Sequence, residues 1–180
     1  MAGVAFSRVP ILWHPRLRRE DGFVRLVLGL GTRAVNRVAD DYPRLITLSH
    51  PLLRPENQPA VIRRYSQRYM DLMDLDANAF RTLPVDQVVG LDFPPLRWVA
   101  SVDDEDTLMP IVSLGPLSPQ SLVLTFDTLL QRTDFVPLMK QLLSTLSKYY
   151  DFPVDVEFAL TLTPALPKPK ITLHLLQCRP

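Results

Sequence analysis

The sequence predicts an α+β fold with a mostly antiparallel sheet and a few flanking helices. Several short apolar runs are rich in β-branched residues and bounded by glycine or proline. One segment, residues 134–150, carries leucines at helical spacing. The last two strand-like runs are joined by PALPKPK, which is too short for a parallel crossover and therefore predicts an antiparallel pair.

Three strands and one short helix are predicted in the N-terminal part of the chain. GVAFS begins the first strand, FVRLVLGLG over residues 23–31 forms a buried strand, and RLITLS after Pro43 forms the third. The Pro- and Arg-rich segment VPILWHPRLRRED is a loop. TRAVNRVAD is predicted as a short helix, with Thr32 as its N-cap.

The middle of the chain carries weaker signals. Residues 60–80 are weakly helical in pattern, and residues 84–110 combine prolines with the acidic run DDED at 103–106, which is typical of a solvated loop. PQSLVLTFDTLL predicts a strand that leads into a turn. The amphipathic helix follows, with Asp134 as its candidate N-cap, and then come the strands VDVEFALTLT and KITLHLLQCR.

Composition limits the possible functions. The length of 180 residues suits one domain, and the net charge of +1 argues against bulk affinity for nucleic acid or a membrane surface. The single cysteine, Cys178, excludes an internal disulfide framework and suggests a cytoplasmic protein. No apolar run is long enough for a membrane span, and the N-terminus lacks the pattern of a signal peptide. Sixteen of the twenty basic residues are arginines, which either reflects base composition or favours bidentate contacts with phosphate and carboxylate.

The last two strands carry the polar side chains with the clearest chemistry. Alternation in VDVEFAL places Asp155 and Glu157 on one face and the apolar residues on the other. In ITLHLLQCRP, alternation predicts one shared face for Leu173, Leu175, Gln177 and Arg179. Pairing of the strands could then bring two carboxylates, an amide oxygen and a guanidinium together, as in a Mg²⁺–polyphosphate site. The alternative is a solvent-exposed strand face with a frayed end.

Four motifs occur in an order that resembles one protein family. GVAFSRVP resembles a G-V-x-F-[ST]-R-x-P motif, FVRLVLGLGTRAV resembles a strand and its G-L-G-E-x-V turn, and YPRLITLS occupies the place of a following strand. VDVEFA and LQCRP resemble a D-x-E-[FW] strand followed by L-Q-x-R. Together they resemble the ATP-binding domain of the pyruvate phosphate dikinase and phosphoenolpyruvate synthase family, whose fold is ATP-grasp-like. Residues 55–125 match least well and are interpreted as a divergent or inserted region.

The resemblance implies roles for four residues. Glu157 and Gln177 occupy the positions that hold Mg²⁺ and the nucleotide phosphates in such domains. Asp155 and Arg179 occupy positions implicated in phosphate binding, and Arg179 in phosphoryl transfer as a catalytic residue. ATP and Mg²⁺ are therefore the expected ligands, with weak binding by the chain alone.

The resemblance also implies partners and shows departures. Residues 1–180 correspond to the C-terminal part of the family's nucleotide-binding domain, so a preceding subdomain that supplies a lysine and an arginine is expected elsewhere. A phosphohistidine domain and a phosphoenolpyruvate/pyruvate-binding barrel are expected in the parent protein, with no nucleic-acid or membrane partner. The family's G-L-G-E reads G-L-G-T here, so Thr32 stands where an acidic residue is usual.

Three functions follow from these observations. The first is part of an ATP-dependent phosphotransferase that phosphorylates a histidine on another domain and is inactive in isolation. The second is a non-catalytic nucleotide-binding or regulatory module that retains the fold, which the Thr32 departure favours. The third is an interaction protein whose Arg-rich N-terminal half binds an acidic partner, which the near-neutral net charge disfavours.

Overall fold

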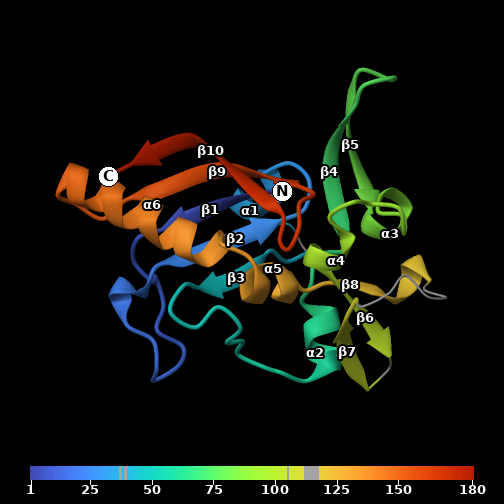
Figure 1. The fold of residues 1–180 in the computed structure, drawn as a ribbon, viewed down its shortest axis with the longest axis horizontal. Coiled ribbons are helices and arrows are strands. Elements are labelled where there is room, and N and C mark those ends of the chain that lie inside the picture. Colours follow the sequence, from blue (N-terminus) through green and yellow to red (C-terminus); the bar gives the residue numbers. More distant parts are fainter. Residues whose placement is uncertain (37, 39, 105, 112–117) are drawn as a thin grey trace.

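The centre of the protein is a five-stranded antiparallel sheet. A computed structural model describes residues 1–36, 38, 40–104, 106–111 and 118–180. The strands of this sheet lie in the order β10-β9-β1-β2-β3 (Figure 1). Their bounds are Ala2–Phe6 for β1, Phe23–Val27 for β2, Arg44–Thr47 for β3, Asp155–Thr163 for β9 and Lys170–Arg179 for β10. All neighbours pair in antiparallel fashion, which confirms the predicted α+β class.

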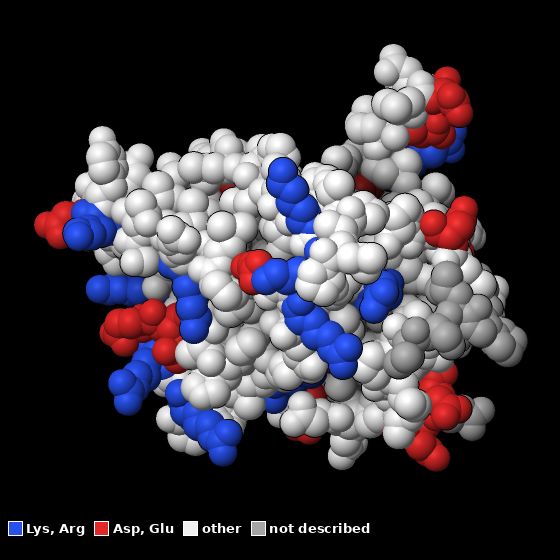
Figure 2. Space-filling model, viewed as in Figure 1, with Lys and Arg blue, Asp and Glu red and all other residues white. Residues whose placement is uncertain are grey.

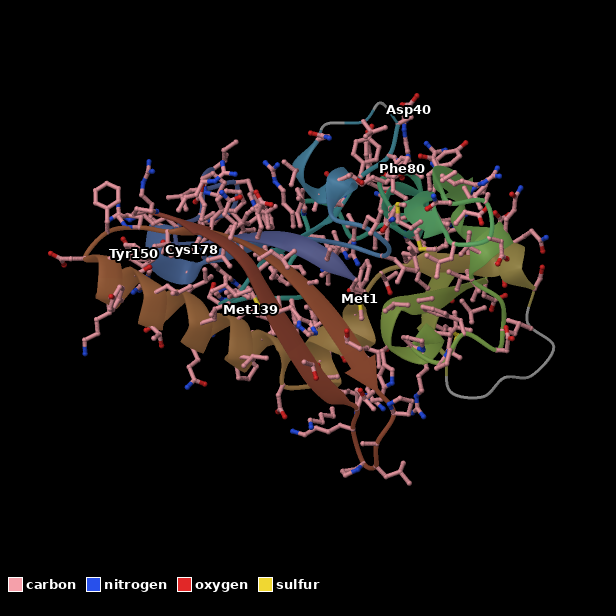
Figure 3. All side chains as sticks on the ribbon, turned by 90° about the horizontal axis from the view of Figure 1, so that it is seen from above. Met1, Asp40, Phe80, Met139, Tyr150 and Cys178 are labelled. Carbon is pink, nitrogen blue, oxygen red and sulfur yellow. The ribbon has the colours of Figure 1, made fainter. Side chains whose placement is uncertain are left out.

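One long helix covers one face of this sheet. Helix α6 (Phe135–Tyr150) follows the short helix α5 (Asp127–Arg132), and Figure 3 shows Met139 of α6 beneath the strands. Met139 is fully buried, and the ring of Phe135 lies 6.3 Å from that of Phe158 on β9. The predicted amphipathic helix is confirmed. Asp134 stands at its N-cap position but makes no capping hydrogen bond, and its carboxylate instead accepts one from Lys168 Nζ at 2.6 Å.

The predicted N-terminal elements form, but they are shorter than expected. Strand β2 ends at Val27, because the chain then turns through Gly29 at a φ of 91°. Helix α1 spans only Thr32–Val35, and its N-cap residue is Gly31. The prediction of Thr32 as N-cap is therefore wrong: its hydroxyl donates instead to Asp71 Oδ2 at 2.6 Å. Residues 37 and 39 of the predicted helix lie outside the described part of the chain.

Residues 60–80 are helical only at their start. Helix α2 spans Pro59–Arg64, and the chain then forms a hairpin of β4 (Tyr69–Asp74) and β5 (Ala79–Pro84) that projects from the body of the protein (Figure 1). The helical prediction is wrong beyond α2. The hairpin turn is stabilised by Asn78 in the left-handed region and by a hydrogen bond from Ala77 N to Asp74 Oδ1.

Residues 84–110 form more regular structure than predicted. Helices α3 (Val85–Val88) and α4 (Leu96–Val99) precede a three-stranded antiparallel sheet of β6 (Ala100–Asp104), β7 (Thr107–Pro110) and β8 (Leu122–Leu124). Asp103 and Asp104 belong to β6, so the acidic run is not only a solvated loop, and residue 105 lies outside the described part. Single 3-10 turns occur at Arg19–Asp21 and Pro119–Ser121.

The peripheral elements share one hydrophobic core with the central sheet. Val85, Val99 and Leu124 belong to the same buried cluster as Phe158 of β9 and Met139 of α6. The description of residues 55–125 as divergent or inserted stays a prediction, but this segment is not a separately packed unit. Within the described residues, no helix is both long and apolar enough to cross a membrane.

Gly29 provides a test of the turn that docks the hairpin. Its φ is positive, and an added Cβ would lie 2.6 Å from the carbonyl oxygen of Asp71. We expect Gly29→Ala to lower the free energy of unfolding by about 2 kcal/mol or more. Gly31→Ala is the matched control, because Gly31 has helical dihedrals and an added Cβ would lie 3.4 Å from that of Ala2. Urea unfolding should separate the two variants, and equal effects would contradict the strained turn.

Candidate functional site

The candidate site lies where β9 and β10 pair near the end of the chain. Leu175 pairs with Phe158, Gln177 pairs with Glu157, and Arg179 pairs with Asp155. The register shifts between Leu175 and Gln177, so β10 contains one extra residue in a β-bulge. The predicted antiparallel pairing of these strands is confirmed.

The bulge changes the face on which the polar side chains lie. Leu173 is opposite Leu160 and Leu175 is opposite Phe158, which places both on the core-facing side. Gln177 and Arg179 lie on the opposite side, because one extra residue reverses the alternation. The predicted common face for these four residues is therefore wrong.

Glu157, Gln177 and Arg179 meet on the outer face of the sheet, away from α6. Arg179 Nη2 donates to Gln177 Oε1 at 2.8 Å and to Glu157 Oε1 at 3.3 Å. The side chain of Arg179 is 63% exposed and that of Glu157 is 37% exposed. Exposed ion pairs of this kind contribute little to stability, so the guanidinium can exchange these oxygens for another anion at small cost.

Asp155 flanks this group and lacks full charge compensation. It pairs across the sheet with Arg179 on one side and with Phe6 of β1 on the other. Partial removal from water raises the pKa of Asp155, and the positive charge of Arg179 opposes that rise only in part. The outer face therefore carries two carboxylates and one arginine at this end of the sheet.

The same face continues toward β2 and carries a second arginine. Glu157 is opposite Val4, and Val4 is opposite Arg25, so these side chains form one row across three strands. Two strand spacings separate the ends of the row, or roughly 10 Å. The guanidinium of Arg25 lies 5.7 Å from the centre of the Phe6 ring. The sequence reasoning missed Arg25, although its position in the strand FVRLV indicated an unusual charge on a buried strand.

An acidic side chain lies beside Thr32, although the sequence has none at that position. The carboxylate of Asp71 on β4 accepts hydrogen bonds of 2.6 Å from Thr32 and Thr82, and Arg33 Nε lies 3.0 Å from its Oδ1. Burial alone would raise the pKa of Asp71, but the two hydroxyls and Arg33 outweigh it, and the pKa is lowered. This tertiary contact had no signal in the sequence.

The donor atoms on the outer face fit a cation only together with a ligand. Among the described residues, no group of three or more histidine, cysteine, aspartate and glutamate side chains could hold a metal ion. Mg²⁺, however, is commonly held by one or two carboxylates plus water and substrate phosphates. Glu157 and Gln177 supply hard oxygens of this type, whereas their role as metal ligands stays a prediction.

These features place carboxylates, an amide oxygen and arginines on one face at the end of an antiparallel sheet. Residues 1–180 match the family model described as pyruvate phosphate dikinase, AMP/ATP-binding domain. The chain therefore belongs to this family of ATP/AMP-binding domains, as the motifs predicted. Comparison with curated proteins and with solved structures gives no match.

Two leucines of β10 test the bulge. Leu176, the extra residue, is 65% exposed, whereas Leu173 packs against the core. We expect Leu176→Lys to change the free energy of unfolding by less than about 0.5 kcal/mol, and Leu173→Lys to lower it by about 1–3 kcal/mol. Urea unfolding measures both, and a larger loss for Leu176→Lys would contradict the assigned faces.

Asp155 gives a pH-dependent test. Because its pKa is raised on folding, the folded state holds this proton more tightly than the unfolded state. The contribution of Asp155 to stability is therefore most favourable at low pH. It declines as the pH rises from 3.8, the ordinary pKa of the side chain, through the raised pKa of the folded state. We expect Asp155→Asn to be more stable than the wild type at pH 7, and this difference to vanish below the ordinary pKa.

Asp74 is the control with the opposite sign. The pKa of Asp74 is lowered, chiefly because its carboxylate accepts a backbone hydrogen bond from Ala77. Asp74→Asn should therefore lose stability at neutral pH, and the loss should disappear as pH falls below the lowered value. Urea unfolding from pH 3 to about pH 7 compares the two variants. The same sign of effect for both would contradict the assigned environments.

Proposed function

We propose that this chain supplies the Mg²⁺ and phosphate contacts of the nucleotide site in a cytoplasmic phosphotransferase related to pyruvate phosphate dikinase and phosphoenolpyruvate synthase. In this proposal, it corresponds to the C-terminal part of the ATP-binding domain. The supporting observation is that Glu157, Gln177 and Arg179 meet on one open sheet face through direct contacts. Membership of the AMP/ATP-binding family supports the choice of ligand.

Glu157 and Gln177 would hold the metal ion. Their carboxylate and amide oxygens lie on directly paired residues of neighbouring strands. Side chains so paired are typically about 4.5–5.5 Å apart at Cβ, which allows both to reach one ion. Bound Mg²⁺ would supply charge neutralisation for the phosphates.

Arg179 would bind the phosphate itself. Its guanidinium now donates to the two oxygens that the metal ion would require. When Glu157 and Gln177 turn to a cation, Arg179 can direct the same N–H groups to a phosphate oxygen. A guanidinium at that point stabilises the negative charge of phosphoryl transfer. The positive charge of bound Mg²⁺ would then lie near the carboxylate of Asp155, which Arg179 compensates only in part in the free protein.

The open geometry explains why the chain alone should bind weakly. Glu157 and Arg179 face solvent, so water competes with each contact they offer. A preceding subdomain with a lysine and an arginine would cover this face and exclude water. A phosphohistidine domain would accept the phosphoryl group, and a phosphoenolpyruvate/pyruvate-binding barrel would use it.

A non-catalytic nucleotide-binding or regulatory module is the second candidate. Thr32 stands in place of the family's acidic residue, and the carboxylate of Asp71 beside it is already engaged by Thr32, Thr82 and Arg33. In the full-length parent, Glu157→Ala and Gln177→Ala should each cut Mg²⁺-dependent phosphoryl transfer at least about tenfold, or about 1.4 kcal/mol. Unchanged rates would remove both residues from the mechanism and favour the regulatory module.

The arginines of the N-terminal half do not support the third candidate, a binding surface for an acidic partner. Figure 2 shows positive and negative side chains interspersed on the face that it presents. Several of these arginines are engaged by aspartates of the same chain, namely Arg33, Arg44, Arg54 and Arg63.

Calorimetric titration with Mg·ATP tests the proposed function in this chain. We expect weak binding, with a dissociation constant well above about 10 µM, because one side of the site is open to solvent. Glu157→Ala should weaken it further, whereas Glu20→Ala, an exposed acid on a 3-10 turn, should not. Dissociation constants in the low micromolar range or below would contradict the proposal that this chain carries only part of the nucleotide site. The chain alone should also form no phosphoenolpyruvate from pyruvate and ATP.

A further inference from the structure

A cavity lies beside the β3 edge of the central sheet, the edge opposite β10. It is bordered by the loop before β2, by β2 and β3, and by α2, it is open to solvent on one side, and its volume is about 380 Å³. Small-molecule sites are typically clefts of about 300–1,000 Å³ with apolar walls and few polar groups. Its apolar walls include Trp13, Phe23, Tyr42, Leu45, Val61 and Ile62.

Two arginines line this cavity, and both lie near one partly exposed carboxylate, that of Asp127. Arg54 Nη2 lies 2.9 Å from Asp127 Oδ1, and Arg44 Nη2 lies 3.5 Å from the same oxygen. Arg44 also donates to the backbone oxygens of Leu45 at 2.7 Å and Pro51 at 3.1 Å. Its Nε is buried without a hydrogen-bond partner among the described residues.

This arrangement leaves positive charge in excess. Burial, followed by the positive charge of Arg54, lowers the pKa of Arg44 to about 9, and Asp127 opposes this only in part. Arg44 is therefore still protonated at neutral pH, at 7% exposure. The acid of the cavity wall itself, Glu56, is exposed and screened by water. An anion in the cavity would supply the missing negative charge.

We propose that this cavity binds a small anion with a flat apolar body, of the class of aromatic carboxylates. Its carboxylate would lie toward Arg54 and Arg44, and its ring would lie among the apolar walls that include Trp13, Tyr42 and Ile62. The site goes beyond the proposed nucleotide function. Phe23 on β2 is the nearest strand residue of the cavity wall, and β2 lies two strand spacings from Glu157 on β9 and three from Gln177 on β10, or roughly 10 Å and 14 Å.

The two tryptophans of the chain allow a direct test, because Trp13 lines the cavity and Trp98 does not. In a Trp98→Phe background, benzoate should change Trp13 fluorescence saturably, with a dissociation constant of about 1 mM or less for a ligand of this size. Benzyl alcohol, which lacks the charge, and acetate, which lacks the ring, should each bind at least about tenfold more weakly.

Two variants separate charge from shape. Arg54→Met should weaken benzoate binding at least about tenfold. Ile62→Phe, which fills the cavity without changing its charge, should also weaken it. Arg81→Met is the matched control, because Arg81 pairs with Asp74 on the distant hairpin, and it should bind benzoate as the parent does. Thermal unfolding confirms that each variant is folded.

Three results would overturn the proposal. The first is no saturable response to benzoate. The second is equal binding of benzyl alcohol, or of benzoate to Arg54→Met, which would show an apolar cavity without anion recognition. The third is competition between benzoate and AMP in the presence of Mg²⁺, which would make the cavity part of the nucleotide site. The third result would leave the proposed nucleotide function standing. If Mg·ATP failed to bind while benzoate still bound, the proposed nucleotide function would fail and the anion site would stand.

Discussion

The β-bulge in β10 resolves a conflict between two parts of one strand. Leu173 packs against the core and Leu175 shares its side of the sheet at 47% exposure, whereas Gln177 and Arg179 face water on the other side, yet strict alternation places all four on one side. Regular pairing would put the amide of Gln177 opposite the buried Val156, on the side of the sheet that α6 covers, and would remove it and the guanidinium partly from water, which is unfavourable. One extra, exposed residue, Leu176, satisfies both requirements. The candidate site exists because of this local irregularity, not in spite of it.

A buried polar network then fixes the hairpin against the same sheet. The side chain of Gln67 bonds to both the N–H and the oxygen of Leu28 at 2.8 Å, as a paired strand would. Arg33 bridges Asp41 and Asp71, which are both buried. This network offers a physical reason for Thr32. A glutamate at that position would bring a third carboxylate to one arginine, whereas a hydroxyl donates to Asp71.

The sequence predicted those features that depend on local periodicity. The strands of the central sheet, helix α6 and the antiparallel pairing of β9 with β10 follow from alternation, helical spacing and a short connection. The meeting of Glu157 with Gln177 was also predicted, but in the structure it depends on the bulge. The face of Leu173 was predicted wrongly, because a bulge leaves no mark in an alternating pattern. The hairpin of β4 and β5 was missed because its apolar residues fit neither period cleanly. Asn78, which adopts the left-handed conformation of its turn, was the one usable signal.

The arginine clusters differ in what surrounds them, and this difference indicates what each can do. Arg33 faces two carboxylates, and hydroxyls and backbone N–H groups complete the hydrogen bonding of those carboxylates. Within the described part of the chain, Arg33 Nε makes no hydrogen bond but lies 3.0 Å from Asp71 Oδ1, so the charges of this cluster are balanced and its role is structural. Arg179 also accompanies two carboxylates, but on an exposed face where contacts can be exchanged, and this is the cluster that we propose to hold a cation together with phosphate. Arg44 and Arg54 share one carboxylate in a mostly apolar cavity, which leaves a positive charge that an anion can neutralise. Charge balance and burial together, more than the number of arginines, therefore separate a structural cluster from a site for a cation and a site for an anion.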